Sequence, residues 1–280
     1  MKEFVFKNIG PLDLAATLDC GQSFRWVPAG EDAGADGGAA FCAVVEGEVA
    51  TARVKDGALR VSSASLAKDF WREYFALDID YGALHAEFRK DATLAACLEF
   101  APGIRVLRQP FFETLVSFII SQNNNIPRIK GIISRLCENF GERIGTLPDG
   151  SAAHAFPSAE RLAALSADDL ACLRSGYRAP AIVDAARRTA RGELSAAELR
   201  AAPALEARKK LLAVYGVGPK IADCVLLFGL GRFETFPVDV WIRRAMASLF
   251  PNGLPAAAVP CAGIAQQYIF HYARMTGLNS

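Results

Sequence analysis

The 280-residue sequence lacks any long hydrophobic run, because no stretch approaches the roughly eighteen consecutive apolar residues that a membrane-spanning helix needs. Its first ten residues, MKEFVFKNIG, contain no apolar signal core. We therefore expect no membrane partner and a cytoplasmic location. Hydrophobic residues nevertheless make up 52% of the chain, which at this length is enough for a globular protein with a sizeable core.

The sequence also lacks the cysteine spacings of metal sites and disulfide frameworks. Its seven cysteines are scattered, their number is odd, and no CxxC pair occurs. This pattern is typical of reduced thiols in a cytosolic protein.

An excess of charge of one sign is missing as well, since the net charge is only +1. The distribution is uneven, however, with a net charge of −6 over residues 1–100 and +6 over residues 101–244. A basic middle beside an acidic start indicates a partner-binding face. The alternative is that most of these arginines lie on solvated helix faces.

Local patterns divide the chain into two parts. In the first part, alternating residues separated by Gly47 and Asp56-Gly57 turns predict strands at 23–27, 41–46, 49–55 and 58–62, with a small-residue loop at 30–40. After Ser65 the periodicity is helical, at 66–75, 84–90 and 93–100. The sequence predicts an α+β protein: an N-terminal antiparallel β-sheet domain with flanking helices at 1–100, then an all-helical body at 101–280.

Helical periodicity continues through the second part, where Pro127 and Pro219 fit helix starts and Gly176 fits a helix end. The predicted helices lie at 110–122, 128–140, 177–192, 240–250 and 256–276, with shorter helices between 155 and 173.

One stretch, LLAVYGVGPKIADCVLLFGL at 211–230, predicts a helix, a tight turn and a second helix. Gly216 and Gly218 allow backbone conformations closed to other residues, and Pro219 suits the first position of the second helix. Such a turn leaves N–H groups pointing outward at a helix N-terminus, where they can bind a phosphate. The stretch resembles the helix-hairpin-helix DNA-binding motif, which holds the DNA backbone without reading sequence.

Two side chains beside this turn are candidates for catalysis. Lys220 lies in the first turn of the second helix, where the positive end of the helix dipole disfavours an ammonium group, so its amine can act as a nucleophile that forms a Schiff base. The alternative role of Lys220 is to bind a phosphate. Asp239, nineteen residues later, can cap the helix at 240–250 and also face a DNA-binding groove.

The hairpin at about 208–230, its GVGPK turn and the following Pro237-Val238-Asp239 together resemble the helix-hairpin-helix DNA glycosylase superfamily. They resemble the branch that carries both a lysine and an aspartate, whose members are glycosylases with lyase activity. The resemblance implies that Lys220 and Asp239 are catalytic.

Further strings resemble the 8-oxoguanine DNA glycosylases. GQSFRW at 21–26 resembles a segment in which the glycine carbonyl, here that of Gly21, accepts a hydrogen bond from the N7–H that only the oxidised base carries. By pattern alone the same string is a core strand. SQNNNIPRI at 121–129 resembles the segment in which Asn123 and Arg128 hold the cytosine left behind when the base flips out; the alternative is a polar loop.

The resemblance also assigns residues around the flipped base. Tyr177 is the wedge that fills the gap and Arg178 a second contact to the orphaned cytosine, although Tyr177 by pattern fits a core aromatic equally well. Cys224 and Phe270 lie on either side of the base. Gln266, rather than the adjacent Gln267, reads its Watson–Crick edge, because Phe270 fixes the register. Many relatives have a histidine phosphate contact where this chain has Trp241, and Arg243 or Arg244 can take its place.

We therefore expect a monomeric base-excision-repair enzyme that removes 8-oxoguanine from double-stranded DNA, preferably opposite cytosine, and nicks the strand through a lysine Schiff base. In a prokaryote it would be associated with the nucleoid. No cofactor or catalytic metal is required, although hairpin carbonyls can bind a structural monovalent or divalent cation. A four-cysteine iron–sulfur cluster is excluded, since only Cys261 follows Asp239.

Two alternatives remain. The first is a glycosylase of the same superfamily for another damaged base; alkylbase glycosylases generally lack the lysine, so Lys220 counts against them. The second is a non-catalytic DNA-binding protein that uses the hairpin alone. For such a protein, Lys220→Gln and Asp239→Asn would leave all function intact.

Overall fold

The protein is described by a computed structural model that covers residues 1–29 and 39–277. Within these residues, five antiparallel strands form one sheet in the order β1-β5-β4-β3-β2. Most of the predicted loop at 30–40 lies outside the described residues. The strands are β1 (Lys2–Phe6), β2 (Val27–Pro28), β3 (Ala40–Val45), β4 (Glu48–Lys55) and β5 (Ala58–Ser63).

Two helices, α1 (Leu14–Asp19) and α2 (Lys68–Tyr74), pack against one apolar face of this sheet. The face is built from alternate strand residues, which point to the same side of a pleated sheet. Trp71 of α2 is fully buried against it and donates a hydrogen bond from Nε1 to Ser63 Oγ at 3.0 Å. The sheet thus has a core of its own.

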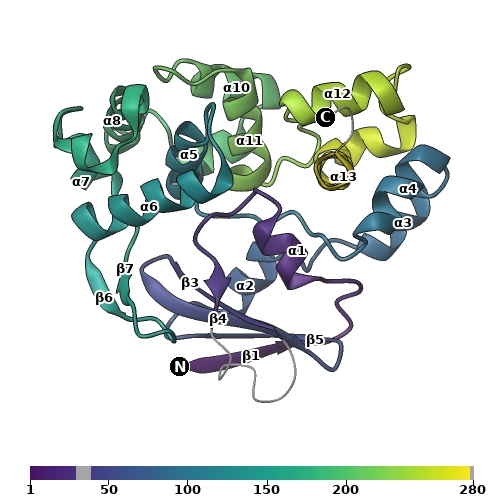
Figure 1. Ribbon diagram of the computed structural model, residues 1–280, viewed down its shortest axis with the longest axis horizontal. Coiled ribbons are helices and arrows are strands. Elements are labelled where there is room, and N and C mark those ends of the chain that lie inside the picture. Colours follow the sequence, from purple (N-terminus) through teal and green to yellow (C-terminus); the bar gives the residue numbers. More distant parts are fainter. Residues whose placement is uncertain (30–38, 278–280) are drawn as a thin grey trace.

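The larger core lies in the helical body above the sheet (Figure 1). There α5 packs against α11, and α13 packs against α4 and α12. The helices of this part are α3 (Tyr81–Phe88), α4 (Ala92–Phe100), α5 (Phe111–Ile120), α6 (Ile126–Phe140), α7 (Ala159–Ala163), α8 (Ala179–Ala190), α9 (Ala196–Ala201), α10 (Ala204–Leu212), α11 (Pro219–Leu230), α12 (Val240–Leu249) and α13 (Ala262–Thr276), with 3-10 turns η2 (Asp169–Leu173), η3 (Gly176–Arg178) and η4 (Ala256–Cys261).

The predicted α+β class is confirmed, with the sheet first and the helices after it. The predicted domain division at residue 100 stays a prediction. Side chains of α3 and α4, which lie before that position, belong to the core of the helical body.

Several local predictions were wrong. The predicted strand at 23–27 is a bent segment that pairs only at Val27–Pro28, because Phe24 packs into the core of the helical body and Trp26 into the core of the sheet. The predicted helix at 256–276 begins as the 3-10 turn η4, where Pro260 has no N–H to donate. The sequence also failed to indicate β1 and the hairpin β6 (Arg143–Thr146) with β7 (Ala152–His154).

Candidate active site

The predicted hairpin is present as α10, a turn and α11. Gly216 in the turn has φ +71°, which favours glycine, and a Cβ there would lie 3.2 Å from the Ala181 side chain of α8. The turn is anchored from both sides. Asp184 of α8 accepts a hydrogen bond from Tyr215 N–H at 2.8 Å, and Arg208 of α10 makes a two-point ion pair with Asp223 of α11 at 2.6 and 3.1 Å.

Lys220 occupies the first turn of α11, directly after Gly218 at the N-cap and Pro219 at the first helical position. Its Nζ lies 5.2 Å from the centroid of the Phe118 ring, which stacks on Phe228 at 5.4 Å. Lys220 is therefore half-buried against an aromatic wall.

Asp239 is the N-cap of α12, as predicted, and its Oδ1 accepts a hydrogen bond from Ile242 N–H at 2.8 Å. The cap fixes the carboxylate at the end of the segment that joins α11 to α12. The carboxylate is only partly buried, so it keeps contact with the space in front of the helix.

A small cavity of about 40 Å³ joins these two residues. All four predicted base-binding residues line the cavity along with both predicted catalytic residues, although they come from widely separated parts of the chain. Its lining is Cys20, Gly21, Phe118, Lys220, Cys224, Phe228, Pro237, Asp239, Gln266, Gln267 and Phe270.

Gly21 has φ +88°, and a Cβ there would meet Ile126 and Phe270 at 3.5 and 3.8 Å. The next residue, Gln22, is fully buried and anchors this segment. Its Nε2 donates to the carbonyls of Thr17 and Arg105 at 2.8 and 2.7 Å, and its Oε1 accepts from Leu107 N–H at 2.8 Å. Sequence reasoning missed Gln22, because only the fold supplies its partners.

Cys224 forms the wall of the cavity one helical turn after Lys220. Burial raises the pKa of its thiol to about 11, and the charge of Lys220 opposes this rise. The thiol therefore stays protonated at neutral pH and presents a small, soft surface to whatever fills the cavity.

The cavity opens into a groove of about 850 Å³, whose lining includes Gly21, Lys220, Asp239 and Phe270. The predicted DNA-binding residues Asn123, Tyr177 and Gly218 also line it. Trp241 and Arg243 of α12 and Arg274 of α13 complete this side of the groove. Gly216 and Arg128 are not among its lining residues.

The loop that contains Asn123 and the turn that contains Tyr177 lie next to each other at the far wall of the groove. Tyr177 is 62% exposed, as a wedge must be, whereas Arg178 beside it is only 3% exposed. The Arg178 guanidinium donates to three backbone carbonyls: to Gln122 and Ser175 at 3.0 Å, and to Asn123 at 3.0 Å. Asn123 itself has φ +44°, so Arg178 holds the asparagine loop in an unusual backbone conformation.

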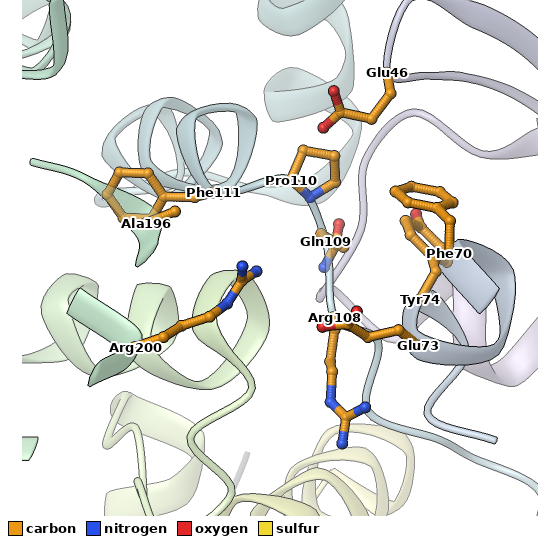
Figure 2. Close-up of a pocket in the computed structure, with 10 residues that line it drawn as sticks. All are labelled: Glu46, Phe70, Glu73, Tyr74, Arg108, Gln109, Pro110, Phe111, Ala196 and Arg200. Carbon is orange, nitrogen blue, oxygen red and sulfur yellow. The ribbon is translucent and has the colours of Figure 1, made fainter. Parts of the chain in front are cut away.

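A separate pocket of about 250 Å³ lies between the sheet and α9 and contains none of the predicted residues (Figure 2). Figure 2 shows the Arg108 guanidinium directed away from Glu46, and Arg108 pairs with Asp78 at 2.8 Å. Its lining contains no lysine or cysteine and shares no residue with the groove.

Within residues 1–29 and 39–277, no three histidine, cysteine or acidic side chains are grouped so that they could hold a metal ion. In the same part of the chain, no helix is both long and apolar enough to cross a membrane.

This combination, a helix-hairpin-helix turn beside a groove whose cavity holds a lysine and an aspartate, defines the class of helix-hairpin-helix DNA glycosylases. Residues 4–115 match the N-terminal domain of 8-oxoguanine DNA glycosylase, and residues 116–254 match the HhH-GPD superfamily of base excision DNA repair proteins. The chain belongs to the 8-oxoguanine DNA glycosylase family, whose members are N-glycosylase/DNA lyases.

Individual relatives agree with this assignment. The chain is 38% identical over 183 residues to an N-glycosylase/DNA lyase of Saccharomyces cerevisiae, a match that covers 61% of this chain and 48% of that protein. It is 32% identical over 221 residues to a "Probable N-glycosylase/DNA lyase" of Methanothermobacter thermautotrophicus, covering 68% and 70% of the two chains. This chain therefore spans about half the length of the yeast relative.

Among solved structures, the chain is similar to Clostridium acetobutylicum 8-oxoguanine glycosylase/lyase in complex with double-stranded DNA containing cytosine opposite 8-oxoguanine. The TM-score is 0.87 and the sequence identity 31%, and the match covers 99% of this chain and 98% of that one.

Proposed function

We propose that this protein excises 8-oxoguanine from duplex DNA, preferably opposite cytosine, and cleaves the strand through a Schiff base on Lys220. The observation that carries the proposal is the shared cavity, in which Lys220 and Asp239 lie with Gly21, Cys224 and Phe270. The cavity opens into a groove beside the hairpin turn, as a site that acts on an extruded base requires.

Lesion recognition rests on Gly21. A backbone carbonyl accepts a hydrogen bond from the N7–H of 8-oxoguanine, whereas unmodified guanine presents a lone pair at N7 and repels it. Cys224 and Phe270 take the two faces of the base. The cavity of about 40 Å³ is far smaller than ligand sites of about 300–1,000 Å³, so base entry has to move a side chain. Phe270 is half-buried at the mouth and is the side chain best placed to move.

The chemistry follows from the two functional groups. The Lys220 amine attacks C1′, the bond from C1′ to N9 breaks, and the base leaves with the electron pair and takes up a proton. The Asp239 carboxylate stabilises the positive charge that develops on the sugar. Ring opening gives the Schiff base, and loss of a proton from C2′ then expels the 3′ phosphate. These steps need no metal or cofactor.

The opposite base is held by the loops at the far wall of the groove. Asn123 and Tyr177 line the groove and are exposed, so that Tyr177 can fill the gap in the duplex, and Arg128 is exposed on α6 outside the groove lining. The bonds of Arg178 to backbone carbonyls support an additional role, in which it shapes the Asn123 loop. The clostridial relative binds DNA with cytosine opposite the lesion, which favours the same partner base here. The protein would act as a monomer, and a cation on the hairpin carbonyls remains a prediction.

The test is borohydride trapping on duplexes with one 8-oxoguanine opposite cytosine, adenine, guanine or thymine. Wild type is compared with Lys220→Gln, and with Lys130→Gln as a matched control, because Lys130 pairs with Asp19 on α1. We expect a covalent band with wild type and the control, strongest opposite cytosine, and none with Lys220→Gln. A persistent band in Lys220→Gln would refute the nucleophile, and equal trapping opposite all four bases would refute the preference for cytosine.

A further inference from the structure

A hydrogen-bonded chain of side chains runs along one wall of the cavity. Gln266 Nε2 donates to the Pro237 carbonyl at 3.2 Å, and Gln267 Nε2 donates to Gln266 Oε1 at 2.8 Å. The Cys20 thiol in turn donates to Gln267 Oε1 at 3.3 Å. Both glutamines are buried, at 5% and 4% exposure, so water is largely excluded as an alternative partner.

The direction of this chain is fixed at its Pro237 end. A backbone carbonyl can only accept, so the Pro237 oxygen selects the NH₂ end of the Gln266 amide. That choice places Gln266 Oε1 toward Gln267, which must then present its own NH₂ group. At the other end, burial raises the pKa of the Cys20 thiol to about 11, so the thiol keeps its proton and can donate it to Gln267 Oε1 or to the Thr17 carbonyl, each at 3.3 Å.

The orientation of a carboxamide decides which purine edge it matches. Guanine-type bases have an oxygen acceptor at position 6 and an N1–H donor, whereas adenine-type bases have an amino donor at position 6 and an acceptor at N1. An amide that faces positions 6 and 1 pairs with guanine-type bases in one orientation. When it is rotated by 180°, so that its oxygen and its NH₂ group exchange places, it pairs with adenine-type bases instead. A Gln266 amide free to flip could therefore accept both.

We propose that Gln267, which the Cys20 thiol contacts, is a positioning residue that acts together with the Pro237 carbonyl to lock the Gln266 amide in one orientation and so restricts the enzyme to 6-oxo purines. The inference rests on the proposed function, since it concerns the same cavity. Gln267 does not have to touch the base. Its bond to Gln266 Oε1 supports the Gln266 orientation that the Pro237 carbonyl selects, and the contact with the Cys20 thiol supports the orientation of Gln267 itself.

The test uses two lesions that share the N7–H read by Gly21 but differ at the Watson–Crick edge, namely 8-oxoguanine and 8-oxoadenine. Each is placed opposite cytosine, so that the orphan-base contacts stay constant. Single-turnover excision rates are measured for wild type and Gln267→Leu, which keeps the side-chain volume but loses both hydrogen bonds. We expect wild type to prefer 8-oxoguanine strongly, and the ratio of the two rates to fall by about 10-fold or more in the variant.

A second pair of variants decides the matter if Gln267→Leu folds poorly. Cys20→Ala removes the donor and should lower the ratio, whereas Cys20→Ser keeps a hydroxyl donor and should restore it. A variant that merely loosens the fold lowers both rates together and leaves the ratio unchanged. An unchanged ratio in Gln267→Leu and Cys20→Ala, or a wild type that excises both lesions equally, would overturn the inference. A wild type that excises neither lesion would instead overturn the proposed function.

Discussion

Replacement of Gln22 by methionine is expected to destabilise the protein more than almost any other change of similar size. Methionine matches the length of the glutamine side chain but supplies none of its hydrogen bonds. The fully buried Gln22 amide bonds to Thr17 of α1 and to Arg105 and Leu107 of a second segment, and Gln22 directly follows Gly21 of the cavity wall.

The size of the effect can be worked out group by group. The Thr17 carbonyl lies 3.3 Å from the Cys20 thiol, which can turn its single proton from Gln267 to this carbonyl. The Arg105 carbonyl and the Leu107 N–H lose the partner that Gln22 supplies, and each buried polar group left unpaired costs about 1–3 kcal/mol. The free energy of unfolding should therefore fall by about 2–6 kcal/mol, a large part of the roughly 5–15 kcal/mol of a typical domain.

The assay is urea unfolding followed by far-ultraviolet circular dichroism. Gln122→Met is the matched control, because Gln122 is half-buried and makes one side-chain bond, to the Ile119 carbonyl at 3.2 Å. The control should change the free energy of unfolding by less than about 0.5 kcal/mol. A loss below about 1 kcal/mol in Gln22→Met would show that the segment is held by packing alone and would refute the reasoning.

Two further predictions concern the cavity. Asp239→Asn should keep the helix cap, since asparagine caps as well as aspartate, but should lower the single-turnover excision rate by about 100-fold or more. Asp239→Ala should lose the same activity and, in addition, about 1 kcal/mol of the free energy of unfolding. Equal excision rates for Asp239→Asn and wild type would contradict this prediction. Burial raises the pKa of the Cys224 thiol in the folded protein from 9.0, its ordinary value, to about 11. Its contribution to stability is complete below pH 9 and is lost as the pH rises toward 11, by up to about 2–3 kcal/mol. Urea unfolding at pH 8 and pH 11 in reductant should show a larger loss for wild type than for Cys224→Ala, and parallel losses would rule out this titration.

Features encoded by neighbouring residues could be predicted from the sequence. The glycines and proline of the hairpin, the cap at Asp239 and the helical periodicity all act over a few residues, so their structural consequences follow from local rules. The α+β order of the chain is predictable for the same reason. Local rules failed at 23–27, where an alternating pattern typical of a strand belongs to a bent core segment.

The strands β1 and β6–β7 were not predictable, because short strands draw their stability from partners that the local sequence does not name. The buried position of Arg178 was hidden for a similar reason. Its sequence neighbours suggest an exposed pair with Tyr177, but the carbonyls that bind it belong to another loop, including those of Gln122 and Asn123.

By itself, then, the sequence determined the class of fold, the hairpin and the identity of the lysine and aspartate beside it, since each rests on short motifs. Only the tertiary structure decided that these residues share one cavity with Gly21 and Phe270, and that Gln22 and Gln267 support it. Cys20 and Gln267 are 247 residues apart in the chain, yet they share a hydrogen bond. No local pattern can specify such a contact, because it exists only after the N-terminal segment and the last helix have packed together.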